Sequence, residues 1–97
     1  MRSDARVYLY FLPASEGGRL TPISPGMFHG SAQFPGAPHC FDFRIEVFEE
    51  LAPGSARELN LAFLCPEDVR PFLEPGATFL VWVGHSIAEG RVLDSNI

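Results

Sequence analysis

The chain contains no lysine, so its positive charge rests on seven arginines alone. Twelve aspartates and glutamates outweigh them, which gives a net charge of −5 and an isoelectric point near 5.0. Binding that is driven by phosphate neutralisation needs a basic face. The composition therefore argues against a general nucleic-acid binder, although it is compatible with a local cluster of arginines.

Long apolar runs are also missing. Apolar runs such as Phe79 to Val83 are far too short to cross a membrane. The first residues are charged and lack the apolar segment of a secretory signal peptide. We therefore expect a cytoplasmic protein with no membrane partner.

Cysteine is scarce, with Cys40 and Cys65 as the only two. In a reducing cytoplasm we expect both thiols to be free, and to be buried as small apolar side chains. Together with His29, His39 and His85 they could supply metal ligands, but none of these residues has the close paired spacing of a zinc site. We predict no metal site and no other cofactor.

Motifs that carry catalysis are absent as well. The chain has no Gly-x-Ser-x-Gly elbow and no glycine-rich phosphate loop ending in lysine. Adjacency in sequence does not give a nucleophile and a base the geometry that they need, which applies to the pairs His85–Ser86 and His39–Cys40. A solvated turn and a helix start explain the acidic pairs Glu49–Glu50 and Glu67–Asp68 more simply than catalysis does. We predict no catalytic residue and no enzymatic activity.

The chain is rich in turn formers and in aromatic side chains. It has nine glycines and nine prolines, with nine phenylalanines, two tyrosines and one tryptophan for the core. Ninety-seven residues with this composition predict one all-β domain spanning residues 1–97.

Strand periodicity is clearest over residues 39–48, where apolar and charged side chains alternate from Phe41 to Val47. Similar segments bounded by proline and glycine predict further strands over 6–12, 27–34, 57–64, 77–83 and 87–93. Residues 66–73 predict a helix of about one turn, because Pro66 suits its start and Pro71 limits its length. The tail from Asp94 to Ile97 is expected to be loose. Short strands at this spacing are typical of either a sandwich or a closed barrel.

Two of these strands are apolar on both faces. Inside one small barrel there is no room for both faces, so the second set of side chains is expected on the outer wall: Tyr8, Tyr10, Leu12, Leu80 and Trp82. Exposed apolar patches of this kind mark protein–protein contacts more often than chemistry. We therefore take Tyr8, Tyr10 and Trp82 as a candidate surface for a protein partner or for a homodimer. The alternative is that a loop near 35–40 covers them.

Two stretches carry a resemblance to a known family. One is Glu16-Gly17-Gly18-Arg19-Leu20-Thr21-Pro22, and the other runs from Pro75 to Gly84 and on to Ile87-Ala88-Glu89-Gly90. Together they resemble the C-terminal β-barrel domain (domain III) of translation elongation factor Tu, which has a Gly-Gly-Arg-x-Thr-Pro turn after its first strand. The resemblance covers roughly residues 5–93. It implies a six-stranded antiparallel closed barrel, here as a stand-alone domain that binds no GTP by itself.

In that family the barrel helps to hold the T stem of aminoacyl-tRNA. Carried over, the contacts fall on Arg19 and Thr21 in the Gly17-Gly18 turn, and on Gly84 in place of a Glu-Gly pair whose glutamate is here Val83. The family's following Gly-Gly-Arg is also absent. The resemblance implies an accessory domain that binds RNA or aminoacyl-tRNA, which the acidic charge disfavours.

Arg19 could also hold a small anion, since its guanidinium offers a fork of donors beside two glycines. The simpler interpretation is a tight turn in which Arg19 pairs with Glu16. The leading hypothesis from the sequence is a non-enzymatic binding module that acts by protein–protein contact. RNA binding and binding of a small anion at the Gly-Gly-Arg turn are the two alternatives.

Overall fold

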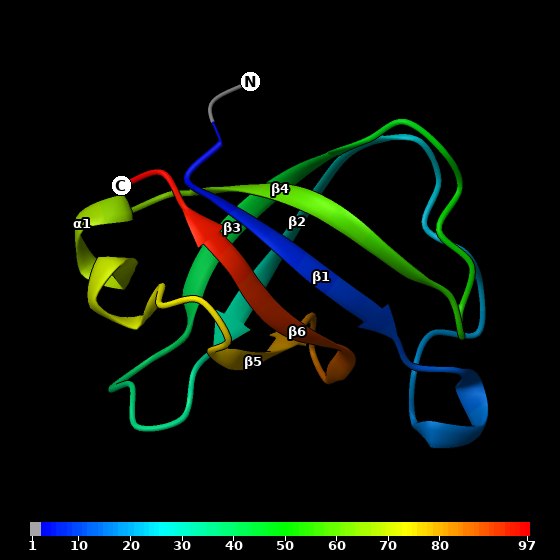
Figure 1. The fold of residues 1–97 in the computed structure, drawn as a ribbon. Helices are drawn as coiled ribbons and strands as arrows, with labels where there is room; N and C mark the ends of the chain where they lie inside the picture. Colours follow the sequence, from blue (N-terminus) through cyan, green and yellow to red (C-terminus); the bar gives the residue numbers. More distant parts are fainter. Residues whose placement is uncertain (1–2) are drawn as a thin grey trace.

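The computed structural model describes residues 3–97, which form a closed antiparallel barrel of six strands (Figure 1). The strands are β1 (Ala5–Phe11), β2 (Gly26–Gln33), β3 (Phe41–Val47), β4 (Ala56–Phe63), β5 (Thr78–Trp82) and β6 (Ser86–Ser95). They follow one another around the barrel in the order β1-β4-β3-β2-β5-β6. Because β6 pairs with β1, each of the six strands has a neighbouring strand on both sides. The predicted all-β, six-stranded antiparallel barrel is confirmed.

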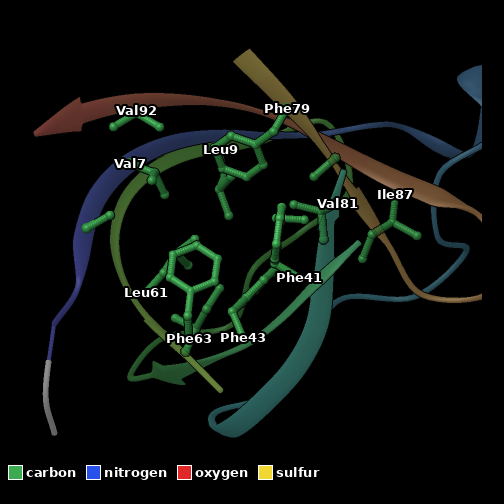
Figure 2. Packing of buried hydrophobic residues seen from close by; sticks show 14 of the residues in the cluster. Val7, Leu9, Phe41, Phe43, Leu61, Phe63, Phe79, Val81, Ile87 and Val92 are labelled. Carbon is green, nitrogen blue, oxygen red and sulfur yellow. The ribbon is translucent and has the colours of Figure 1, made fainter. Parts of the chain in front are cut away.

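Alternation along the strands decides which side chains enter the barrel. In β3 the apolar side chains are buried and the charged ones between them are exposed, and β1 shows the same alternation. Figure 2 shows the inward side chains meeting in one core, including Leu9, Phe43, Phe63, Phe79 and Val81. Each fully buried side chain of this size contributes about 2 kcal/mol through its removal from water.

A short helical segment lies between β4 and β5, as predicted for residues 66–73. Helix α1 (Pro66–Val69) continues into the 3-10 turn η2 (Arg70–Phe72). Val69 is fully buried in the core, and the ring of Phe72 lies 5.9 Å from that of Phe34 and 5.5 Å from that of Phe41. No helix among residues 3–97 is long and apolar enough to span a bilayer.

The Pro35-Gly36 turn after β2 contains a backbone conformation with positive φ, which glycine adopts more readily than other residues. Gly36 has a φ of 81°, and the Ala37 N–H donates to the Phe34 carbonyl at 3.1 Å. Proline at the second position and glycine with positive φ at the third are what a type II β-turn requires. The same dipeptide turns the chain at 53–54 and 75–76.

The C-terminal tail is ordered by its contacts with the start of β1, so the prediction of a loose tail is wrong. Strand β6 runs to Ser95, and Asp94 accepts a hydrogen bond of 2.8 Å from the Arg6 guanidinium. The Asn96 N–H donates to the Asp4 carbonyl at 2.9 Å. The sequence of the tail is polar, but the tail is ordered because its backbone pairs with the first residues of β1, Ala5 and Arg6.

The two cysteines are free, but the prediction that they are buried is wrong. Cys40 precedes β3 and Cys65 follows β4, and both side chains are exposed. Neither residue occupies an inward position of a strand, so burial in the core is not open to them.

Candidate functional site

The outer face of β1 carries two tyrosines. Tyr8 and Tyr10 alternate with the buried residues Val7, Leu9 and Phe11, so both rings lie on the outer wall. The side chain of Tyr8 is 45% exposed, and Tyr10 is half-buried. The core has no room for these rings, so they are available to contact another molecule.

Strand register places a charged side chain beside each tyrosine. On β6, Glu89 lies opposite Tyr10 and Arg91 lies opposite Tyr8. Across β6 on β5, Leu80 lies opposite Glu89 and Thr78 opposite Arg91. These side chains form two rows across the outer wall, Tyr10–Glu89–Leu80 and Tyr8–Arg91–Thr78.

These two rows form the floor of a groove, and the Pro35-Gly36 turn forms one of its walls. The groove encloses about 710 Å³ between the turn and strands β1, β6 and β5. We call it the tyrosine groove; its residues are Tyr8, Tyr10, Gln33, Phe34, Pro35, Gly36, Ala37, Thr78, Phe79, Leu80, Glu89, Gly90 and Arg91. Pro35, Gly36 and Ala37 therefore line the exposed tyrosines from one side and leave Tyr8 open to solvent. A volume of this size is typical of a ligand or peptide site.

Negative charge gathers at the Tyr10 end of the groove. The Tyr10 hydroxyl donates to Oε2 of Glu16 at 3.1 Å. This hydrogen bond is the main reason why the pKa of Tyr10 lies above its ordinary value, with desolvation and the charges of Glu16 and Glu89 adding to it. Two carboxylates therefore act on one phenol.

Glu16 is positioned there by the glycine turn that follows it. The 3-10 turn η1 (Ala14–Glu16) ends at Gly17, whose φ is 90°. Gly18 then passes so close to the Leu12 carbonyl that a Cβ on it would lie 1.8 Å from that oxygen. Glycine is therefore required at Gly18, and the Gly-Gly turn folds Glu16 back towards β1.

Arg19 lies on the other side of this turn and does not pair with Glu16. Its Nε donates to the Thr21 carbonyl at 3.2 Å, and within residues 3–97 it makes no ion pair. The cavity beside Arg19 and Thr21 encloses only about 10 Å³, which is close to the least that one water molecule needs. An anion held by Arg19 would therefore lie on the surface and not in a pocket.

Trp82 belongs to a different depression. Its side chain is 43% exposed and lies on β5 next to Ser31 of β2. The depression around it encloses about 490 Å³ and is lined by residues of β2, β3, β4 and the β5–β6 turn: His29, Gly30, Ser31, Asp42, Phe43, Arg44, Ala62, Leu64, Trp82, Val83 and Gly84. The three aromatic residues of the candidate partner surface are thus divided between two hollows, with Tyr8 and Tyr10 in one and Trp82 in the other. Gly84, with a φ of 73°, is in the turn beside Trp82 and far from Arg19 in the chain.

The arginines are spread around the barrel. Three of the six in the described chain form ion pairs with acids, namely Arg6 with Glu58 and Asp94, Arg57 with Glu49, and Arg70 with Glu67. The other three line three separate hollows, with Arg91 in the tyrosine groove, Arg44 beside Trp82 and Arg19 beside Thr21. Arg2 lies outside the described residues. The single arginine-rich face that phosphate binding favours is not formed by residues 3–97.

Side chains that could bind a metal ion do not converge in the part of the chain that the structure describes. There, no group of three or more histidine, cysteine, aspartate or glutamate side chains could hold a metal ion. His39 contacts the carbonyl of Cys40 through Nδ1 at 2.8 Å, in the loop before β3.

Sequence reasoning placed Tyr8, Tyr10 and Leu80 on the outer wall but missed the charged residues of the groove, Glu89 and Arg91. Glu89 and Arg91 alternate with apolar neighbours, which assigns them to the outer wall. Their place beside the tyrosines depends on the pairing of β6 with β1, which no local pattern reveals. A loop near 35–40 was considered as a cover for the tyrosines, and the side on which its Pro35-Gly36 turn lies follows from the closure of the barrel.

No protein-family model matches the chain, and no curated protein matches it. The residues of the groove, their geometry and their charges are therefore the basis for assigning it a function.

Proposed function

We propose that the chain is a non-enzymatic binding module that holds a protein partner in the tyrosine groove. The observation that carries this proposal is the set of exposed, outward-facing apolar side chains gathered in one open hollow of about 710 Å³. Tyrosine is enriched at protein interfaces because its ring is large and rigid and its hydroxyl can still bond to water or to a partner.

The fold proposal that accompanies it is a barrel like domain III of elongation factor Tu. The Gly-Gly-Arg-x-Thr-Pro turn at 17–22 and the Gly-bounded strand pair at 76–90 support it. The same proposal includes a role for this chain in translation. In that role these residues would not bind GTP by themselves. A cytoplasmic location is supported by the two exposed free thiols, since a reducing compartment preserves such side chains.

A protein partner is favoured over RNA and over a small anion by the distribution of charge. The chain carries a net charge of −5, and its described arginines are either paired with acids or divided among three hollows. The groove itself holds one arginine and one glutamate on a largely apolar floor. Apolar floors with a few polar groups suit a protein segment better than they suit a phosphate backbone.

The test is affinity capture with matched serine variants. The tagged chain is compared with Tyr8→Ser, which empties part of the groove, and with Met27→Ser, which removes an apolar side chain that is 50% exposed on β2 outside the groove. A partner is expected to be captured by the parent chain and by Met27→Ser, and to fall at least tenfold with Tyr8→Ser.

Two controls make this result decisive. Circular dichroism and the thermal midpoint of each variant show that the barrel is intact. A parallel capture after RNase treatment separates protein from RNA binding. If Tyr8→Ser captures the partner as well as the parent chain does, the binding surface lies outside the groove. If the partner is lost after RNase treatment, the RNA alternative is favoured.

A further inference from the structure

The two ends of the tyrosine groove differ in charge. At one end Glu16 and Glu89 both act on the phenol of Tyr10, and at the other end Arg91 lies opposite Tyr8. Glu89 and Arg91 lie two residues apart on the same face of β6, and no ion pair joins them. Each charge is therefore available to a ligand. Because the two ends of the groove carry opposite charges, they would fix the orientation of a bound ligand.

The acidic end is arranged to receive a cation. The Glu16 carboxylate accepts one hydrogen bond from Tyr10, which leaves most of its lone-pair positions open. Glu89 is exposed on the neighbouring strand. A guanidinium or ammonium group between them would gain two charge-assisted hydrogen bonds and would contact an aromatic ring that attracts cations.

The rest of the floor is suited to an extended apolar segment. Tyr8 lies in the row beyond the acidic end, Leu80 lies beside Glu89 on β5, and Pro35 lines the wall of the groove. Grooves lined with aromatic side chains accept extended or polyproline-like chains, which lose little conformational entropy on binding. Arg91 would repel a basic ligand residue placed beside Tyr8. The basic side chain of the ligand is therefore restricted to the end of the groove beside Tyr10.

The net charge of the chain favours a basic partner over a second copy of itself. At −5, two copies repel each other, whereas a basic segment is attracted. A second copy of the chain could also place few basic side chains in the groove of the first, because three of the six arginines in residues 3–97 are paired with acids.

We propose that the groove binds an extended peptide segment of a protein partner that places an arginine or lysine side chain between Glu16 and Glu89 against Tyr10, with apolar residues along Tyr8 and Leu80. This inference rests on the proposed function and adds the chemistry of the partner to it.

The experiment is selection of random dodecapeptides, displayed on phage, against the immobilised chain. Peptides that are selected are synthesised and their affinities measured by fluorescence anisotropy. Each basic residue is then replaced by its neutral isostere, citrulline for arginine and acetyl-lysine for lysine. The expected result is a set of peptides with a shared basic residue whose neutral isostere raises Kd at least tenfold.

Two variants of equal charge change locate the effect. Glu89→Gln is expected to raise Kd at least fivefold and to bind the basic and neutral peptides almost equally. Glu46→Gln removes the same charge from the outer face of β3, on the other side of β2, and is expected to leave Kd within twofold of that of the parent chain. A general attraction of basic peptides to an acidic protein would affect both variants alike, and that outcome overturns the inference.

Failure of the inference and failure of the proposed function give different results. Selected peptides that need Tyr8 but bind equally well with and without their basic residue would overturn the inference and leave the groove as a protein site. Peptides that Tyr8→Ser still binds in full, or a selection that enriches no peptide, would overturn both.

Discussion

At the scale of single residues, one close contact in the barrel is found where a glycine lies under a phenylalanine ring. Gly90 of β6 pairs with Phe79 of β5, and a Cβ added at Gly90 would lie 2.3 Å from Cζ of that ring. The Phe79 side chain points into the core (Figure 2). Glycine at this position leaves the space that the ring occupies.

We predict that Gly90→Ala lowers the free energy of unfolding by about 3 kcal/mol, because a methyl group cannot enter without moving Phe79. Urea denaturation of the variant and the parent chain measures the difference. The double variant Gly90→Ala/Phe79→Leu is expected to recover part of the loss, since the smaller side chain frees space. Additive effects of the two changes would contradict a direct clash.

Tyr10 gives a second residue-scale prediction. Its pKa is raised chiefly by the hydrogen bond that it donates to Glu16. The neutral phenol is therefore the form that the folded state favours. This contribution is present below the ordinary tyrosine pKa and is lost as the pH rises through the pKa of the folded state.

Glu16→Gln is accordingly expected to lower the pKa of Tyr10, because the amide removes the negative charge that opposes ionisation. Titration of the Tyr10 ring carbon by NMR measures it. Glu46→Gln is a matched control on β3, where the same charge is removed far from the phenol. An unchanged Tyr10 pKa in Glu16→Gln would show that the hydrogen bond to Glu16 does not persist in solution.

At the scale of strands and turns, the sequence predicted the elements well and their partners poorly. Alternation over 41–47 and proline–glycine pairs at the turns are local signals, so the strands and the helical segment lie where they were expected. Pairing of β6 with β1 joins residues about 80 positions apart, and nothing local reports it. The groove depends on that pairing, so its tyrosines were predicted and its charged residues were not.

The C-terminal tail gives the prediction that belongs to this scale. Removal of residues 94–97 deletes the pairing of Ser95 with Ala5, and also the hydrogen bond from Asn96 to Asp4. We expect a fall in the thermal midpoint of about 5 °C, since about 1 kcal/mol corresponds to 4–8 °C in a domain of this size. Scanning calorimetry measures the change. A midpoint equal to that of the full chain would mean that the tail adds nothing to the stability of β1.

At the scale of the whole molecule, charge and closure act together. In residues 3–97 every strand has a neighbouring strand on both sides, which limits the open edge through which copies could join their sheets, although β3 and β4 share only two residue pairs. Its arginines are dispersed among acids, so no face of the described chain combines strong positive charge with an open hollow. Binding between two copies of the chain would therefore depend on the apolar hollows of the outer wall. The two larger hollows share no lining residue.

This arrangement leads to a prediction about the oligomeric state. A stable dimer buries about 800 Å² on each partner, and two copies that each carry −5 would have to meet through one of two separate hollows. We expect light scattering to give a monomer at micromolar concentration, both for the parent chain and for Trp82→Ser. A dimer that Trp82→Ser converts to a monomer would instead place a self-association surface at the depression beside Ser31 and Gly84. A dimer that persists in Trp82→Ser but dissociates in Tyr8→Ser would make the tyrosine groove an interface between copies, and would exclude the basic peptide as its occupant in the dimer.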